Sequence, residues 1–133
     1  MGVFEWSVRI YYEDTDAGGV VYYANYLKYL ERARTEWLRS LGFGQQALMH
    51  EAGILFAVRH VEIDYLVAAR FDDQLTVEAA IDTSSKVSLT FAQRILRDDG
   101  TLLCTASVKV VCLDQETFRP TAIPGFIREK IND

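Results

Sequence analysis

A single long amphipathic helix limits what this chain can fold into. Between residues 24 and 41, apolar residues recur at steps of three and four, which is the spacing of one helix face. The stripe consists of Tyr26, Leu30, Ala33, Trp37 and Leu41, with Tyr29 and Leu38 beside it. Gly42, directly after the pattern, is typical of a helix terminus. Because a helix with such a stripe must bury it against another element, we expect a sheet to curl around this helix.

The other apolar segments have the two-residue period of strands. The predicted strands cover residues 3–12, 55–65, 74–82, 86–97 and 101–113. A short helix at 45–51 and a helical turn at 126–130 complete the pattern, and Asp98-Asp99-Gly100 predicts a hairpin turn. The order is a strand, the long helix and four strands in hairpin succession, with the very apolar segment 101–113 central in the sheet. The 133 residues therefore predict a single α+β domain, residues 1–133, with an antiparallel sheet.

Charge and cysteine content argue against several classes of protein. The net charge of −5 argues against nucleic-acid binding, which requires a basic face. No apolar run approaches the ~20 residues of a transmembrane helix, so we expect no membrane insertion. Cys104 and Cys112 fall in one predicted strand, where eight residues at ~3.3 Å each separate them by roughly 26 Å, beyond disulfide reach. We therefore expect reduced cysteines and a cytoplasmic protein.

Short matches to catalytic motifs fail in their context. The segment GFGQQA at 42–47 has the glycines of a dinucleotide fingerprint but follows a helix instead of a strand. His50-Glu51 begins a zinc-protease motif that lacks its second histidine, so no metal site is expected. His60 lies in a predicted strand, where a structural role is commoner than contact with a substrate.

The loop before the long helix carries the chemistry that these motifs lack. Asp16 supplies a carboxylate, and Gly18-Gly19 let another molecule approach the backbone closely. The helix that follows begins with unpaired N–H groups and a partial positive charge, which would polarise a carbonyl and stabilise an oxyanion. Asp16 would then act as a nucleophile or as a base for water. On the residues alone, the alternative is that an acid of this loop merely caps the helix.

The loop and helix together resemble a known signature, in the stretch RIYYEDTDAGGVVYYANYLKYLERARTEWL. It is similar to that of the 4-hydroxybenzoyl-CoA thioesterase family, and in particular to the acyl-CoA thioesterases associated with the Tol–Pal cell-envelope cluster. The matching positions are Arg9-Ile10, Thr15-Asp16 and Gly19-Val20-Val21, and the likeness continues through FGQQALM, DYLVAARFDDQL, FAQRI and VKVVCLD. The resemblance implies the hotdog fold, a long central helix wrapped by a five-stranded antiparallel sheet. It also implies an enzyme that hydrolyses an acyl-CoA to a free acid and CoA.

The same resemblance implies roles for individual residues. Asp16 is the catalytic carboxylate, and the backbone N–H of Tyr23 polarises the thioester carbonyl. Because sites of this family lie between subunits, Val58 and His60 of a second chain are expected to line the acyl pocket. The residues expected near the phosphates of CoA are Ser84, Ser85, Lys86 and Ser88. No cofactor is implied, and a homodimer or a dimer of dimers is expected, with acyl-CoA or an acyl carrier protein as partner.

Several alternatives remain open at this stage. Tyr23 stands where the Tol–Pal-associated members often have histidine, so the chain could instead bind acyl-CoA or acyl carrier protein with little turnover. Glu31 is the alternative catalytic carboxylate, although a salt-bridged structural role is the commoner one within the run ERAR. A hotdog dehydratase would want a histidine in the signature, which is absent here. The aromatic residues that could line a short aliphatic or an aryl pocket are Tyr22, Tyr23, Tyr26 and Phe56.

Overall fold

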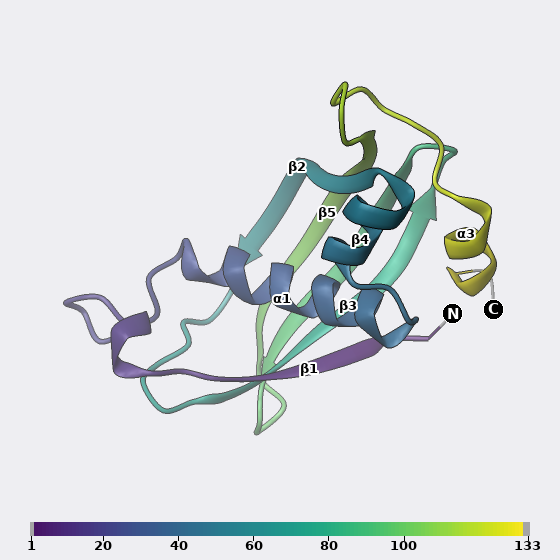
Figure 1. Cartoon of the computed structure of the whole chain (residues 1–133). Helices are drawn as coiled ribbons and strands as arrows, with labels where there is room; N and C mark the ends of the chain where they lie inside the picture. Colours follow the sequence, from purple (N-terminus) through teal and green to yellow (C-terminus); the bar gives the residue numbers. More distant parts are fainter. Residues whose placement is uncertain (1, 132–133) are drawn as a thin grey trace.

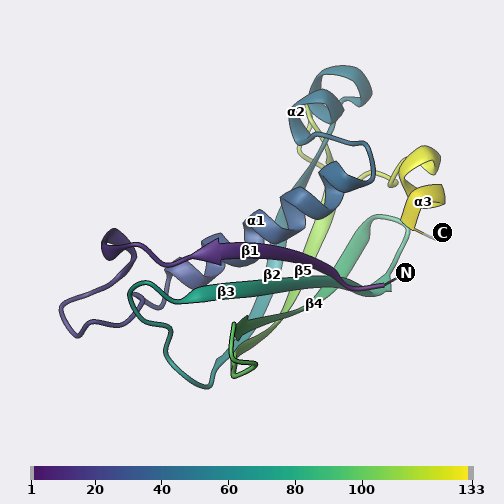
Figure 2. The same cartoon turned by 90° about the horizontal axis from the view of Figure 1, so that it is seen from below.

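A five-stranded antiparallel sheet wraps around one long helix in this protein (Figure 1). The structure is a computed structural model and describes residues 2–131. The strands are β1 (Phe4–Arg9), β2 (Ile54–Tyr65), β3 (Gln74–Ser84), β4 (Ser88–Arg97) and β5 (Leu102–Asp114), in the sheet order β1-β3-β4-β5-β2. The long helix α1 (Asn25–Ser40) lies against one face of the sheet, as Figure 2 shows from below. The predicted α+β class and antiparallel sheet are therefore confirmed.

The shorter elements connect and close this arrangement. A 3₁₀ turn (Tyr12–Asp14) follows β1, while α2 (Gln45–Ala47) and a π-helical turn (Leu48–Ala52) follow α1. Gly42 ends α1 as predicted, with φ +100°. The N–H of Gly42 donates to the carbonyl of Arg39 at 2.9 Å, and the N–H of Phe43 donates to that of Leu38 at 3.2 Å, which is the Schellman pattern. The last helix is α3 (Gly125–Ile131).

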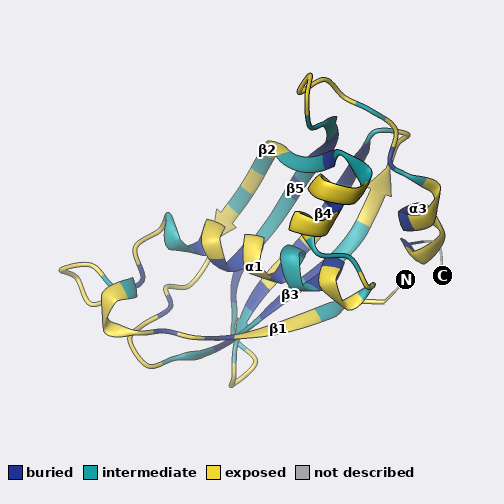
Figure 3. Cartoon of the chain, in the orientation of Figure 1, coloured by how far each residue is buried: buried dark blue, intermediate teal, exposed yellow. Residues whose placement is uncertain are grey.

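The core lies between α1 and the concave face of the sheet, where Figure 3 shows the buried residues. The predicted helix stripe is buried there, with Leu41 only partly so. Alternate residues of β3, namely Leu75, Val77 and Ala79, face the helix and are fully buried. The rings of Trp37 and Phe91 meet edge to face with centroids 5.1 Å apart.

One buried amide ties the helix to the sheet. Gln93 is 2% exposed, and its Nε2 donates to the carbonyls of Leu30 at 3.1 Å and Glu78 at 3.2 Å. Its Oε1 accepts a hydrogen bond from the guanidinium of Arg34 at 3.0 Å. Burial lowers the pKa of Arg34, and the nearby negative charge of Glu31 partly offsets this effect. This one side chain therefore links α1, β3 and β4.

The predicted hairpin succession is wrong at one connection. β2 lies at the edge of the sheet next to β5, and β3 pairs with β1 instead of with β2. Residues 66–73 cross between them, and this crossover is fixed where the N–H of Ala69 donates to the Tyr26 hydroxyl at 2.9 Å. Consequently β5 lies between β4 and β2, and β4 occupies the centre of the sheet.

Two predicted strand boundaries also differ from the structure. β1 ends at Arg9, and Tyr12 is exposed in the 3₁₀ turn because Asp14 accepts the N–H of Tyr11 at 2.7 Å. Lys86 lies in the turn between β3 and β4, since the Ser85 hydroxyl accepts the N–H groups of the two residues that follow Lys86. The Asp98-Asp99-Gly100 hairpin turn is present as predicted, with the N–H of Gly100 donating to Arg97.

Both cysteines lie in β5, with free and buried thiols. Within residues 2–131, no helix combines the length and the apolar character needed to cross a membrane.

Candidate active site

Asp16 lies in a tight hairpin, residues 15–21, which we call the Asp16 hairpin. Thr15 pairs with Val21 across it, and the N–H of Asp16 donates to the carbonyl of Val20 at 2.9 Å. Gly19 closes the turn with φ +80°, a conformation that glycine adopts without steric cost. The hairpin therefore holds Asp16 by its backbone and leaves the side chain free to face outward.

The carboxylate of Asp16 is exposed and only partly engaged. Its Oδ1 accepts the N–H of Gly18 at 2.9 Å, while Oδ2 has no hydrogen bond within the described residues 2–131. A Cβ at Gly18 would lie 3.2 Å from Oδ1, so this glycine allows the close approach. One carboxylate oxygen is thus fixed in orientation and the other is available to a substrate.

The start of α1 presents two free donors. The N–H of Tyr22 donates to the carbonyl of Asp14 at 3.0 Å, and the N–H of Asn25 donates to that of Tyr22 at 2.9 Å. The N–H groups of Tyr23 and Ala24, between them, have no acceptor in the part of the chain that the structure describes. They stand at the positive end of a 16-residue helix and can bind a developing oxyanion.

None of Asp14, Thr15 and Asp16 caps α1, so the capping alternative is wrong for the long helix. Its N-cap is Ala24, without a side-chain hydrogen bond. Asp14 instead closes the 3₁₀ turn through the N–H of Tyr11, and Asp16 bonds within its own turn. The helix donors are therefore left unpaired rather than satisfied by a neighbouring carboxylate.

Two sets of contacts fix the Asp16 hairpin relative to the helix. The Asn25 side chain donates to the carbonyl of Asp14 at 2.9 Å, next to the Tyr22 N–H on the same oxygen. On the other side, the N–H of Val21 donates to the carbonyl of Ala69 at 2.8 Å. Ala69 is in turn bonded to Tyr26 of α1, so the returning half of the hairpin is linked to the helix as well.

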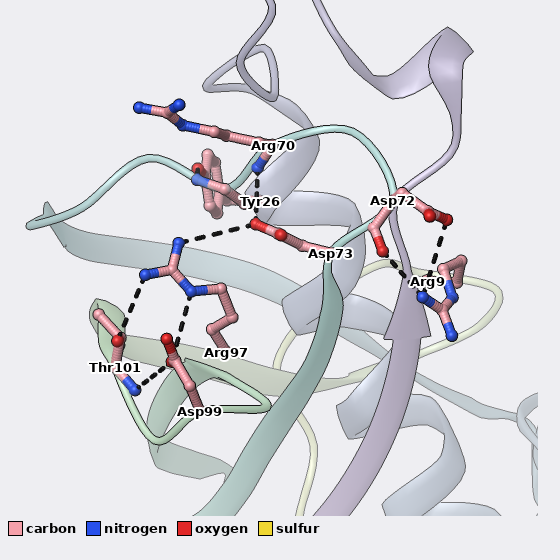
Figure 4. A network of polar contacts seen from close by, with 9 residues as sticks. Arg9, Tyr26, Arg70, Asp72, Asp73, Arg97, Asp99 and Thr101 are labelled. Atoms are coloured by element: carbon pink, nitrogen blue, oxygen red, sulfur yellow. Dashed lines mark hydrogen bonds and ion pairs between the residues drawn. The ribbon is translucent and has the colours of Figure 1, made fainter.

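The crossover that carries Ala69 is itself braced by ion pairs (Figure 4). Arg9 donates to the carbonyl of Asp72 at 2.8 Å and lies 3.7 Å from its carboxylate. Asp73 accepts the N–H of Arg70 at 2.9 Å and lies 3.8 Å from the guanidinium of Arg97. These contacts hold residues 70–73 against the ends of β1 and β4.

Aromatic rings surround the free amides. Tyr22 and Tyr23 are exposed, with ring centroids 4.9 Å apart, and Tyr65 meets Tyr23 edge to face at 6.2 Å. Tyr26 is buried and its hydroxyl accepts the N–H of Ala69, so the expectation that it lines an open acyl pocket is wrong. Burial raises the pKa of Tyr29, whose hydroxyl lies near Asp14 without a hydrogen-bond partner among residues 2–131.

A cavity of about 220 Å³ lies between α1 and strands β2, β4 and β5. Phe56 and Val58 line it from β2, together with Glu31 and Arg34 of α1. Asp16 is not part of its lining. Glu31 forms no ion pair within the described chain, so its predicted salt bridge is absent there, although its charge partly offsets the lowering of the Arg34 pKa by burial.

β2 carries the two residues expected from a second chain. Val58 is 51% exposed, and the register with β5 shifts between Val58 and His60. His60 is also exposed, with its Nε2 3.2 Å from a carboxylate oxygen of Glu62. Within residues 2–131, β2 pairs with a strand on one side only, so its other edge is open.

The residues expected near CoA form the turn between β3 and β4. Ser84, Ser85 and Lys86 are exposed, whereas Ser88 is buried and shares a 2.6 Å hydrogen bond with the Ser85 hydroxyl. The guanidinium of Arg128 in α3 donates to the carbonyls of Ser85 and Lys86. Ser85 and Ser88 thus shape the turn, and Lys86 is the exposed cation on it.

This turn and the Asp16 hairpin lie at opposite ends of β3 (Figure 1). The hairpin contacts Ala69 and Arg70, which lie shortly before β3 begins at Gln74, and the turn follows Ser84. The 11 residues of β3, at ~3.3 Å per residue, place these ends roughly 33 Å apart. Within one chain, therefore, Lys86 is remote from Asp16.

Sequence reasoning missed three residues around the site: Asn25, Tyr65 and Ala69. Their contacts join segments that are 11 to 48 positions apart in the chain, from Asn25–Asp14 to Ala69–Val21. No local pattern signals such contacts, because each depends on the crossover of the sheet over the helix start.

The fold and this site define a hotdog thioesterase, and comparison with known proteins agrees. The model of the thioesterase-like superfamily matches residues 10–131, so the chain belongs to that superfamily. The predicted family, the hotdog fold and the enzyme class of thioesterase are confirmed by this match and by the relatives below.

Individual relatives cover nearly the whole chain. The acyl-CoA thioester hydrolase YbgC of Escherichia coli O6:H1 is 50% identical over 125 residues, which are 94% of this chain and 92% of that protein. A probable thioesterase from Bartonella henselae is 34% identical, with a TM-score of 0.86, and covers 92% of this chain and 100% of that one. A 1,4-dihydroxy-2-naphthoyl-CoA thioesterase from Synechocystis is 26% identical, with a TM-score of 0.91, and covers 99% and 97%.

Proposed function

We propose that this protein hydrolyses a short-chain or aryl acyl-CoA to the free acid and CoA, with Asp16 as the catalytic carboxylate. The observation that carries the proposal is the pair of unpaired N–H groups of Tyr23 and Ala24 beside a hairpin that presents an exposed carboxylate. An acyl-CoA substrate is supported by the 50% identity to an acyl-CoA thioester hydrolase.

The chemistry needs only these groups and water. The thioester carbonyl oxygen accepts a hydrogen bond from the N–H of Tyr23, which makes the carbonyl carbon more electrophilic. The Asp16 carboxylate attacks that carbon, the C–S bond breaks, and CoA leaves as a thiolate that takes a proton from water. Water then hydrolyses the mixed anhydride to the free acid and regenerates Asp16. In the alternative route, Asp16 removes a proton from the water that attacks the carbonyl directly.

The site we propose is shared between two copies of the chain. Two copies joined along the open edge of β2 would bring Val58 and His60 of one chain towards the Asp16 hairpin of the other. The separation of the hairpin from Lys86 by the length of β3 has the same implication, because one ligand would meet both ends more easily when they belong to different chains. The Lys86 ammonium would then contact the phosphates of CoA.

The exposed aromatic rings of Tyr22 and Tyr23 favour a substrate with a small acyl group. Both rings are exposed beside the free amides, and they offer flat apolar surface to an aryl or short aliphatic chain. Phe56 and Val58 would add further apolar surface from the cavity on the second chain.

The decisive experiment is release of free thiol from a panel of acetyl-, butyryl-, hexanoyl-, palmitoyl- and benzoyl-CoA. We expect turnover of the short and aryl substrates, and loss of nearly all turnover in a folded Asp16→Asn variant. Glu31→Gln is the matched control, because it also neutralises an exposed carboxylate near the helix, and we expect it to retain most activity.

The outcomes separate the alternatives. Turnover that persists in Asp16→Asn and is lost in Glu31→Gln would transfer the catalytic role to Glu31. Binding of acyl-CoA without thiol release by the unmodified protein would favour a carrier-protein substrate or a binding module and would refute the proposed activity.

A further inference from the structure

We infer that Tyr65 is a positioning residue for the N–H of Ala24, the second of the two free donors beside the thioester carbonyl; this inference rests on the proposed function. Tyr65 is the last residue of β2, and its phenolic O–H donates to the carbonyl of Tyr23 at 3.2 Å. The two residues are 42 positions apart in the chain. The contact therefore joins the edge of the sheet to the point where α1 begins.

The bonded carbonyl belongs to the same planar peptide unit as the N–H of Ala24. That N–H is one of the two free donors at the helix start. A hydrogen bond to the carbonyl end of a peptide fixes its plane and also polarises its N–H, because hydrogen bonds in a chain strengthen one another. Tyr65 thus acts on both the direction and the donor strength of this end of the helix.

Few other hydrogen bonds hold the peptide unit between Tyr23 and Ala24 in place. The only other donor to the Tyr23 carbonyl among residues 2–131 is the N–H of Tyr26, at 3.4 Å. Both contacts are longer than typical for their kind, and the Tyr65 hydroxyl provides the shorter of the two.

Tyr65 is itself firmly placed. It pairs with Cys104 in the β2–β5 ladder, and the next two N–H groups, of Leu66 and Val67, both donate to the carbonyl of Leu103 at 2.9 and 3.1 Å. Its ring packs edge to face on Tyr26 with centroids 5.3 Å apart. The position of the hydroxyl is thereby fixed by the sheet and not by the hairpin.

The Asp16 hairpin and the Tyr23 carbonyl have different direct hydrogen-bond partners. The Asp16 hairpin is held by Asn25 and Ala69, whereas the Tyr23 carbonyl is held by Tyr65. Loss of the Tyr65 hydroxyl would leave the carboxylate in place while the N–H of Ala24 loses its alignment. Small errors in such alignment slow the chemical step more than they weaken substrate binding.

The test is Tyr65→Phe, which retains the ring contacts and removes only the hydroxyl. We expect kcat to fall roughly 3- to 10-fold, the factor for losing about one net hydrogen bond in the transition state, with KM nearly unchanged. Tyr12→Phe is the matched control, since its exposed hydroxyl has no hydrogen bond within residues 2–131, and it should leave kcat unaltered.

A spectroscopic measurement tests the same inference without turnover. The probe is the panel acyl-CoA that binds most tightly, labelled with ¹³C at its carbonyl carbon. The frequency of its carbonyl stretch is measured when it is bound to Asp16→Asn and when it is bound to the double variant Asp16→Asn/Tyr65→Phe. We expect a shift to lower frequency in the first complex and a smaller shift in the second. Equal shifts, or no shift in either complex, would overturn the inference, as would an unchanged kcat in Tyr65→Phe. Failure of the proposed function appears separately, as absence of thiol release from the unmodified protein.

Discussion

Replacing Gln93 with leucine should destabilise the fold strongly, although the two side chains are similar in size. The change removes two hydrogen bonds to the carbonyls of Leu30 and Glu78 and one from the Arg34 guanidinium. At ~0.5–1.5 kcal/mol for each neutral bond and ~1.5–3 kcal/mol for the charged one, the loss is about 2.5–6 kcal/mol. Burial of the leucine returns about 1–2 kcal/mol, which leaves a net loss of roughly 0.5–5 kcal/mol, with a midpoint of about 3 kcal/mol.

This free energy converts to a large shift in the melting temperature. With ~2.1 cal/mol/K of unfolding entropy per residue over 133 residues, each kcal/mol lowers Tm by roughly 3–4 °C. We therefore expect Gln93→Leu to lower Tm by about 10 °C, within a range of about 2–18 °C, in thermal unfolding followed by circular dichroism at one fixed protein concentration.

Two further variants make the measurement decisive. Gln46→Leu carries the same replacement at an exposed position of α2 and should leave Tm nearly unchanged. The double variant Gln93→Leu/Arg34→Leu should recover part of the loss, because it no longer buries an unpaired guanidinium. A fall in Tm of less than about 2 °C in Gln93→Leu would refute the idea that this amide ties the helix to the sheet.

Three other predictions follow from single contacts. Gly19→Ala places a Cβ on a residue with φ +80°, and we expect a loss of about 1–2 kcal/mol in urea unfolding, with Gly2→Ala as a control in open space. Backbone N–H groups of Thr117 and Glu116 lower the pKa of Asp114, so its stabilising effect is fully present above the unfolded pKa of ~3.9 and disappears as pH falls through the lower folded pKa. Asp114→Asn should therefore reduce the free energy of unfolding at pH 7 and have little effect near pH 2. Equal effects at the two pH values would contradict the assignment. Burial raises the pKa of Cys104 to about 12 and that of Cys112 to about 11, so both thiols should resist alkylation at pH 8 until denaturant is added.

Sequence analysis predicted best those elements in which the spacing of apolar residues corresponds directly to the buried face. The α1 stripe from Tyr26 to Trp37 and the alternation of Leu75, Val77 and Ala79 were both read from spacing, because each faces the same core. The order of strands was not accessible in this way. β2 and β3 have ordinary strand patterns, and nothing within either shows that residues 66–73 carry the chain across the sheet.

The residues of the candidate site fall into the same two groups, those that sequence patterns predict and those that they do not. Asp16 and Gly19 could be proposed from sequence, because a carboxylate and a glycine in a turn before a helix have a direct chemical meaning. The contacts of Asn25 and Tyr65 could not, since each depends on a backbone carbonyl that only the folded chain brings near. Helix geometry predicts unpaired N–H groups at the start of α1, but only the resemblance pointed to Tyr23 among them, and the hydrogen bonds around it show that its N–H is free within residues 2–131.

The length of β3 implies that two differently defective chains can complement each other. Within one chain the roughly 33 Å length of β3 lies between the Asp16 hairpin and the Lys86 turn, so under the proposed arrangement each site takes these two parts from different subunits. Two defective chains should then complement each other. When Asp16→Asn and Lys86→Ala chains are unfolded, mixed equally and refolded, each mixed dimer has one site with both defects and one with neither. About a quarter of all sites should regain both groups, whereas sites contained within one chain would regain none.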